Sequence, residues 1–182
     1  MPDGGLSPCA IKVIGVGGGG CNAVDRMMDT VHSGVEFWAL NTDAQVLKRS
    51  KAKGANVLNI GKASTRGLGA GGNPDCGRMA AEESAQEILK IVQDTDLVFI
   101  TAGMGGGTGS GAAPIVAEIA RSCGCLTVGI VTKPFGFEGR RRMNQSLKAI
   151  DKLCEHVDTV IVVSNDRLLE IIPNNTPLEK AF

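Results

Sequence analysis

The chain has 182 residues, a length that fits one domain with a substantial core. Its 19 lysines and arginines equal its 19 aspartates and glutamates, so it has no basic field that would attract nucleic acid or an anionic membrane. With no tyrosine, one tryptophan and five phenylalanines it has few rings on which unpaired bases could stack, and no apolar run reaches membrane-spanning length.

The N-terminal part of the chain predicts a tail, three strands and one helix. We expect residues 1–10 to form a flexible tail. Short apolar runs between glycine and polar residues then indicate strands over 11–16, 35–41 and 56–60. Apolar residues at helical spacing predict a helix over 21–34, which Gly34 ends. The glycine-rich stretch 61–72 is predicted to be a loop.

The rest of the chain continues this alternation, beginning with a long helix. Asn73 followed by Pro74 is a typical helix start, and the amphipathic pattern predicts one helix that extends to residue 92. Strands are predicted over 96–102, 125–132 and 157–164, and helices over 111–124, 137–156 and 165–172. Alternating helices and continuously apolar strands indicate a parallel sheet that is covered on both faces. The predicted fold is therefore α/β: a Rossmann-like, doubly wound, mainly parallel six-stranded sheet.

Glycine-rich turns follow three of these strands, where a sheet of this kind binds its ligand. They are "GVGGGGCNA" after the first strand, "GLGAGGN" after the third and "GMGGGTGSG" after the fourth. Bare N–H groups at a helix N-terminus bind anions, and glycine lets a phosphate approach them closely. Tight packing is expected to explain one or two of the six glycines in the last turn, so three such turns predict a nucleotide with several phosphates. A side chain at Gly107 is then expected to block binding while the fold stays largely intact.

The first turn by itself supports a different function. Gly15, Gly17 and Gly20 satisfy G-x-G-x-x-G between a strand and a helix, and Asp43 lies near the position of a ribose-binding acid. This pattern is typical of an NAD-dependent oxidoreductase. A dinucleotide fold needs only one such turn, so the later turns favour the polyphosphate interpretation. The P-loop pattern G-x-x-x-x-G-K-[ST] is absent.

The cysteines do not have the spacing of a metal site. None of the six forms a C-x-x-C pair or has a histidine at ligand spacing. We expect them to be small, mostly buried thiols in a reducing compartment.

Six segments together resemble the nucleotide-binding half of the tubulin/FtsZ family of division GTPases. They are "IKVIGVGGGGCNAV", "NTDAQ", "RGLGAGGNP", "FITAGMGGGTGSGAAP", "TKPFGFEGRRR" and "NDRLL", in the family's order and at its spacing. The resemblance implies a domain over 11–182 that binds GTP or GDP with Mg²⁺. It also implies a full-length protein that polymerises into filaments of a division ring, hydrolyses GTP at subunit contacts, and reaches membranes only through other proteins.

The resemblance further implies which residues contact the nucleotide. The phosphate turns would contain Gly18, Gly19, Gly20, Cys21 and Asn22, then Ala70 and Gly71, then Gly105, Gly106, Gly107, Thr108 and Gly109. The ribose and base would be held by Glu138, Arg142 and Asn165. Taken without the resemblance, Glu138 and Arg142 could be a surface pair and Asn165 a helix cap. No catalytic residue and no metal ligand from the chain is expected, and Asp43 and Asp75 are simply acids near phosphate loops.

The last residues have the pattern of a helix N-terminus, but too few residues follow to form the helix. Thr176, Pro177 and Glu179 form a capping box, and the chain ends at Phe182. We therefore expect a chain truncated before the family's central helix and second domain, with their catalytic acidic loop, so that hydrolysis by the chain alone is negligible. Segments such as "GRRRM" resemble plastid and cyanobacterial members, so we expect the chloroplast stroma or, alternatively, a bacterial cytoplasm.

Overall fold

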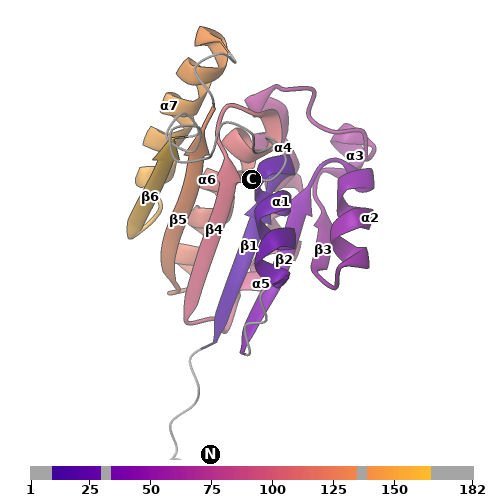
Figure 1. Ribbon diagram of the computed structural model, residues 1–182. Helices are drawn as coiled ribbons and strands as arrows, with labels where there is room; N and C mark the ends of the chain where they lie inside the picture. Colours follow the sequence, from indigo (N-terminus) through magenta and orange to yellow (C-terminus); the bar gives the residue numbers. More distant parts are fainter. Residues whose placement is uncertain (1–9, 30–33, 135–138, 165–182) are drawn as a thin grey trace, which may run out of the picture.

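A computed structural model describes residues 10–29, 34–134 and 139–164. Its strands form one sheet in the order β3-β2-β1-β4-β5-β6, and each neighbouring pair is parallel (Figure 1). The strands are β1 (Ile11–Val16), β2 (Val35–Asn41), β3 (Asn56–Asn59), β4 (Leu97–Gly103), β5 (Leu126–Lys133) and β6 (Thr159–Ser164). The doubly wound α/β prediction is confirmed, and the strand order reverses between β1 and β4.

Helices lie on both faces of this sheet (Figure 1). They are α1 (Gly17–Met28), α2 (Ala44–Ala52), α3 (Lys62–Thr65), α4 (Pro74–Glu83), α5 (Ala85–Val92), α6 (Gly107–Ser122) and α7 (Arg140–Cys154). On one face, α1 packs on β1, β2 and β4, and α2 packs on β2 and β3. On the other face, α6 packs on β1, β4 and β5, and α7 packs on β5. α4 and α5 pack against α6 on that second face.

The main core lies between the sheet and the helices α4 to α7. Ile14, Val98 and Ile100 from the strands are completely buried there, against Val116 of α6 and Leu153 of α7. Removing each such side chain from water stabilises the fold by about 1.5–3 kcal/mol. The apolar strand runs seen in the sequence are thus explained by burial inside a layered α/β domain.

Several helix boundaries differ from the predicted ones. α1 and α6 begin at Gly17 and Gly107, each one turn before the predicted start. Glycine, which helix propensity disfavours, fills the first turn of α1 and half of the first turn of α6. The predicted helix over 74–92 is two helices divided at Ser84, and α2 was not predicted. The predicted helix over 165–172 lies outside the residues that the structure describes.

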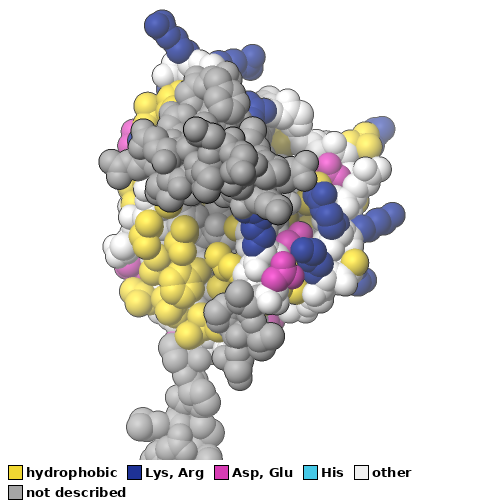
Figure 2. Space-filling view, viewed as in Figure 1, with side chains coloured by type: hydrophobic (Ala, Val, Ile, Leu, Met, Phe, Trp, Pro, Cys, Tyr) yellow, Lys and Arg dark blue, Asp and Glu magenta, His cyan; other side chains and the backbone are white. Residues whose placement is uncertain are grey.

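One face of the sheet carries an exposed apolar surface (Figure 2). On the α1 side of β5 and β6, no helix in the described ranges packs on the strands. On the same face, a shallow hollow of about 290 Å³ extends from β2 across β1 and β4 to β5, and is lined by Ile11, Val13, Met27, Val35, Phe37, Phe99, Thr101 and Ile130. Ile161 is the register partner of Ile130 and is 49% exposed. Among the described helices, none is long and apolar enough to cross a membrane.

Candidate functional site

A hollow of about 300 Å³ lies at the carboxyl ends of β1, β2 and β4. It is lined by residues that follow these strands and by the loop before α4: Gly18, Gly19, Asn41, Thr42, Asp43, Val46, Gly69, Ala70, Gly72, Gly103, Gly106, Gly107, Thr108 and Gly109. The strand order reverses between β1 and β4, and open α/β sheets bind their ligands in the crevice at such a point. Sheet topology therefore marks this hollow as the candidate site.

Two helices begin at the hollow without a side-chain cap. α1 starts after Val16 and α6 after Gly106, and neither of these residues caps its helix with a side chain. α2 and α4 are different, because Asp43 accepts a hydrogen bond from Gln45 N (2.9 Å) and Asn73 accepts one from Asp75 N (3.0 Å). The first-turn N–H groups of α1 and α6 are therefore left for another acceptor, and the positive end of each helix dipole favours an anion.

Close backbone packing requires many of the glycines in these turns. An added Cβ at Gly20 would collide with the carbonyl oxygen of Thr101, and one at Gly109 would lie 2.6 Å from the carbonyl oxygen of Gly103. At Gly107 it would lie 2.8 Å from Asn73 N, and at Gly111 it would collide with the carbonyl oxygen of Pro74 on α4. The expectation that packing explains only one or two glycines of the "GMGGGTGSG" turn is therefore wrong, because α6 packs tightly on both β4 and α4.

Gly18 and Gly106 are glycines that the fold itself does not require. A Cβ at either position would meet no protein atom within 4 Å. Gly106 has φ −84°, which any residue adopts, and Gly18 is not in the positive-φ region either. Both residues line the hollow at the start of an uncapped helix. Neither packing nor backbone conformation explains glycine at these two positions. A reason that remains is that a ligand can approach a backbone without side chains closely.

The turn after β2 forms a third wall of the hollow. The Asn41 side-chain oxygen accepts hydrogen bonds from Thr42 N (2.8 Å) and Asp43 N (3.2 Å), which holds the turn closed. The Thr42 hydroxyl oxygen lies 2.7 Å from that of Thr108 in the first turn of α6. Sequence reasoning named Asp43 but missed Asn41 and Thr42, although "NTDA" follows a strand that neighbours β1.

The structure brings about half of the predicted site residues to the hollow. Those that line it are Gly18, Gly19, Ala70, Gly106, Gly107, Thr108 and Gly109. Gly20 and Cys21 are buried in the next part of α1, whereas Asn22 and Gly71 are exposed. An added Cβ at Gly105 would be 3.1 Å from the carbonyl oxygen of Arg142, so α7 begins beside the "GMGGGTGSG" turn. Glu138 and Asn165 lie outside the described residues.

Cys21 is a neutral, fully buried thiol below the first glycine turn. Its Sγ donates to Leu40 O (3.7 Å) and accepts from Asn41 Nδ2 (3.9 Å). Burial, followed by the charge of Asp25, raises the pKa of Cys21 from 9.0 to about 12. A thiol with this pKa stays protonated at neutral pH and does not act as a nucleophile.

The other described cysteines are less uniformly buried than predicted. Cys125 is buried, Cys76 and Cys123 are intermediate, and Cys154 is exposed. Cys125 directly precedes β5 and is part of the main core, whereas Cys154 is the last residue of α7 and lies at the surface. Within the described ranges, no group of three or more His, Cys, Asp or Glu side chains could hold a metal ion.

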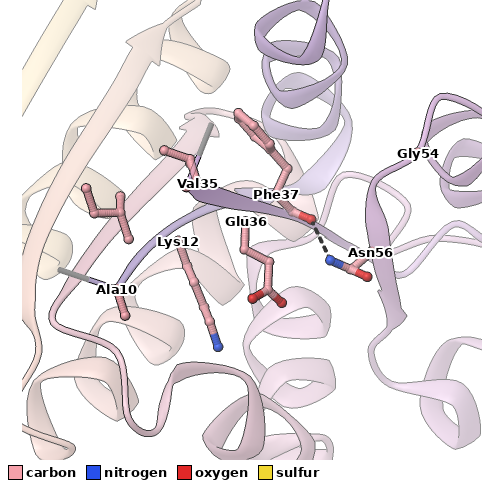
Figure 3. A pocket seen from close by; sticks show the side chains of 9 residues that line it. Ala10, Lys12, Val35, Glu36, Phe37, Gly54 and Asn56 are labelled. Carbon is pink, nitrogen blue, oxygen red and sulfur yellow. Dashed lines mark hydrogen bonds between the residues drawn. The ribbon is translucent and has the colours of Figure 1, made fainter. Parts of the chain in front are cut away.

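A second hollow, of about 470 Å³, lies at the opposite end of the strands (Figure 3). Its polar groups are used by the fold. Asn56 Nδ2 donates to Phe37 O (3.3 Å), Glu36 accepts from the Trp38 indole (2.6 Å), and the Lys12 ammonium donates to Ile91 O near the end of α5. These bonds stabilise strand and helix ends, so the hollow at the carboxyl ends is the better candidate.

Comparison with known proteins agrees with this geometry. Residues 10–173 match the tubulin/FtsZ family, GTPase domain. The chain is similar to an FtsZ dimer from M. jannaschii, with 49% identity and a TM-score of 0.89, over 96% of this chain and 50% of that one. A point mutant of FtsZ from M. jannaschii gives 51% identity and a TM-score of 0.87, over 94% of this chain and 51% of that one.

A more distant likeness supports the fold alone. A GTPγS-bound protofilament of CetZ2 from Haloferax volcanii is 22% identical, with a TM-score of 0.82 over 94% of this chain and 53% of that one. The chain thus spans about half the length of the structures it matches. An NAD-dependent oxidoreductase is not favoured by these matches. The match over residues 10–173 and the identity to FtsZ show that the chain belongs to the tubulin/FtsZ family.

Proposed function

We propose that this chain binds GTP and GDP through the hollow between α1 and α6. The observation that carries the proposal is the pair of glycines, Gly18 and Gly106, that neither packing nor backbone conformation requires. Phosphate oxygens would accept hydrogen bonds from the uncapped first turns of both helices. Glu138, Arg142 and Asn165 are proposed to hold the ribose and base, as the family resemblance implies.

The acid and hydroxyl groups of the hollow also suit a magnesium ion bound with the phosphates. Mg²⁺ prefers oxygen ligands and is usually held by one or two carboxylates together with substrate phosphates and water. Asp43 is a carboxylate that lines the hollow, beside the hydroxyls of Thr42 and Thr108. Mg²⁺ would neutralise phosphate charge there, while the chain's own residues position the nucleotide.

We propose that GTP hydrolysis requires a second copy of the full-length protein. Among the described residues that line the hollow, Asp43 is the acid, and its carboxylate already accepts the α2 N-terminal hydrogen bond from Gln45 N. An FtsZ dimer and a CetZ2 protofilament are among the similar structures, which supports self-association into filaments. The isolated chain should then release phosphate from GTP at a negligible rate. We further propose that the full-length protein is a plastid or bacterial protein that reaches membranes through other proteins.

Calorimetric titration of the purified chain with GDP, GTP, ATP and NADH tests the binding proposal. We expect saturable binding of GDP and GTP and no comparable binding of ATP or NADH. Equal binding of ATP or NADH would overturn guanine specificity. A phosphate-release assay at high protein concentration tests the second proposal, and substantial turnover by the isolated chain would contradict it.

A further inference from the structure

Two threonine hydroxyls meet below the hollow, from segments far apart in the sequence. Thr42 lies in the turn between β2 and α2, and Thr108 lies in the first turn of α6. Their Oγ1 atoms are 2.7 Å apart, which is the distance of a good O–H···O hydrogen bond. Thr42 is 0% and Thr108 8% exposed, so both hydroxyls are shielded from bulk water.

The number of hydrogens on this pair limits what it can do. Each hydroxyl carries one hydrogen and can also accept, so one hydrogen is used between the two oxygens and one is left over. Neither hydroxyl makes a further hydrogen bond to the part of the chain that the structure describes. Both residues line the hollow, so the remaining hydrogen is available to an acceptor inside it. A phosphate group offers mainly acceptor oxygens.

We propose that Thr42 is a positioning residue that orients the Thr108 hydroxyl toward a phosphate oxygen. This inference rests on the proposed nucleotide binding. Thr42 O–H donates to Thr108 Oγ1, which leaves Thr108 O–H to donate into the hollow. The greater exposure of Thr108 and its place in the uncapped first turn of α6 decide the direction. A chain of two hydroxyls also polarises the outer one, which makes it a better donor.

Thr42 is held firmly enough to act in this way. Its backbone N–H donates to Asn41 Oδ1 (2.8 Å), and its carbonyl oxygen accepts from Thr65 Oγ1 (3.4 Å). Thr108 is the second residue of α6, and a helical threonine without such a partner can take either of two χ1 rotamers. The Thr42 hydroxyl therefore selects the rotamer of Thr108 in which the donor is available to the ligand.

The test compares GDP binding by Thr42→Val and Thr42→Ser in the 182-residue chain. Valine keeps the shape and removes the hydroxyl, so we expect GDP affinity to fall about tenfold, whereas serine keeps the hydroxyl and should stay within about twofold. Thr127→Val is the matched control, because Thr127 is also a fully buried threonine whose hydroxyl donates to a backbone carbonyl, Cys125 O (3.2 Å), away from the hollow. Its GDP affinity should be unchanged.

A double-mutant cycle with Thr108→Val separates positioning from a structural role. If Thr42 acts through Thr108, adding Thr42→Val to Thr108→Val should weaken GDP binding no further. Additive losses, or equal affinities of the wild-type chain and Thr42→Val, would overturn this inference alone. Absence of GDP binding by the wild-type chain would overturn the proposed function together with it. If Thr42→Val does not fold, the comparison of Thr42→Ala with Thr42→Ser decides, and equal affinities of those two variants would again contradict the inference.

Discussion

Glycines of the same sequence motif have different physical roles in this chain. At Gly111 the fold places the carbonyl of Pro74 where a side chain would begin, whereas at Gly106 it places nothing. Substitutions at the first kind of glycine change stability, and substitutions at the second kind should change ligand binding. Gly107 belongs to the first kind, because an added Cβ would lie 2.8 Å from Asn73 N. Gly107→Val would therefore disturb the fold and cannot separate the two effects.

Gly106→Ala is the variant that isolates ligand binding. Alanine adopts φ −84° without strain and its methyl group meets no protein atom, so the free energy of unfolding should change by less than about 1 kcal/mol. The same methyl group lies beside the bare N–H groups of α6, so GDP affinity should fall at least about tenfold. Calorimetry and urea unfolding of the same preparation check both values.

Gly111→Ala is the matched control for that measurement. Its methyl group would collide with the Pro74 carbonyl, so we expect a loss of roughly 1–3 kcal/mol in the free energy of unfolding. If Gly106→Ala keeps full GDP affinity while Gly111→Ala is destabilised as expected, the result would contradict the proposal that nucleotide binding requires glycine at position 106.

The Cys21 thiol makes a second residue-scale prediction, on stability at alkaline pH. The thiol ionises near 9.0 in the unfolded chain and only near 12 in the folded one. The unfolded state therefore loses its proton first, and folded-state stability falls as the pH rises from about 9 to about 12, by at most about 1.4 kcal/mol per pH unit. Cys21→Ala should unfold with a shallower pH dependence over this range. Identical slopes for the two chains would contradict this account of the thiol.

At the scale of elements, one exposed carboxylate caps α3, the short helix before the glycine-rich loop that follows β3. Glu83 at the end of α4 accepts hydrogen bonds from Ala63 N and Ser64 N (both 3.1 Å), the first amides of α3. Ser84, the next residue, accepts one from Gly61 N (3.0 Å). The division between α4 and α5 at Ser84 thus coincides with the anchor of the loop that leads to Ala70.

Removing this cap should loosen the loop without unfolding the domain. Glu83→Ala leaves two α3 amides without their acceptor, so we expect faster hydrogen exchange over residues 62–72 and a loss of about 0.5–2 kcal/mol in stability. Glu82→Ala is the control, because its exposed pair with Arg78 (3.1 Å) contributes little. Equal exchange in the two variants would show that Glu83 does not hold the loop.

At the scale of the whole molecule, the apolar sheet face over β5 and β6, on which none of the described helices packs, is the feature that bears on assembly. Apolar side chains gather on it over β1, β4 and β5 (Figure 2), and Ile161 extends this surface onto β6. Contiguous exposed apolar surface favours association with another surface. We expect this chain to self-associate at high concentration through this face.

Sedimentation velocity over a range of concentrations checks that expectation. Ile161→Lys places a charge on the surface and should shift the chain toward the monomer. Leu147→Lys is the control, because Leu147 is 44% exposed on α7, on the other side of the sheet. A similar shift in both variants would locate the association elsewhere, and a wild-type chain that stays monomeric would contradict it.

The amino-acid sequence by itself determined the fold class and the end of the sheet at which the candidate ligand site lies. Apolar runs and helical spacing are local patterns, so they identified all six strands of the described sheet and most of its helices. Glycine-rich turns after strands one, three and four were equally visible in the sequence. Parallel strands bring their carboxyl ends to one edge of the sheet, so these turns indicated the end at which the candidate site lies. α2 was missed since its short, polar pattern carries a weak local signal.

Only the tertiary structure decided which of those glycines serve packing and which leave room for a ligand. That distinction depends on distances between α6, α4 and β4, which no local pattern contains. The same reason hid Thr42, whose partner Thr108 lies 66 residues away in the sequence. The two side chains meet because β2 and β4, whose carboxyl ends lead to Thr42 and Thr108, flank β1 in the parallel sheet.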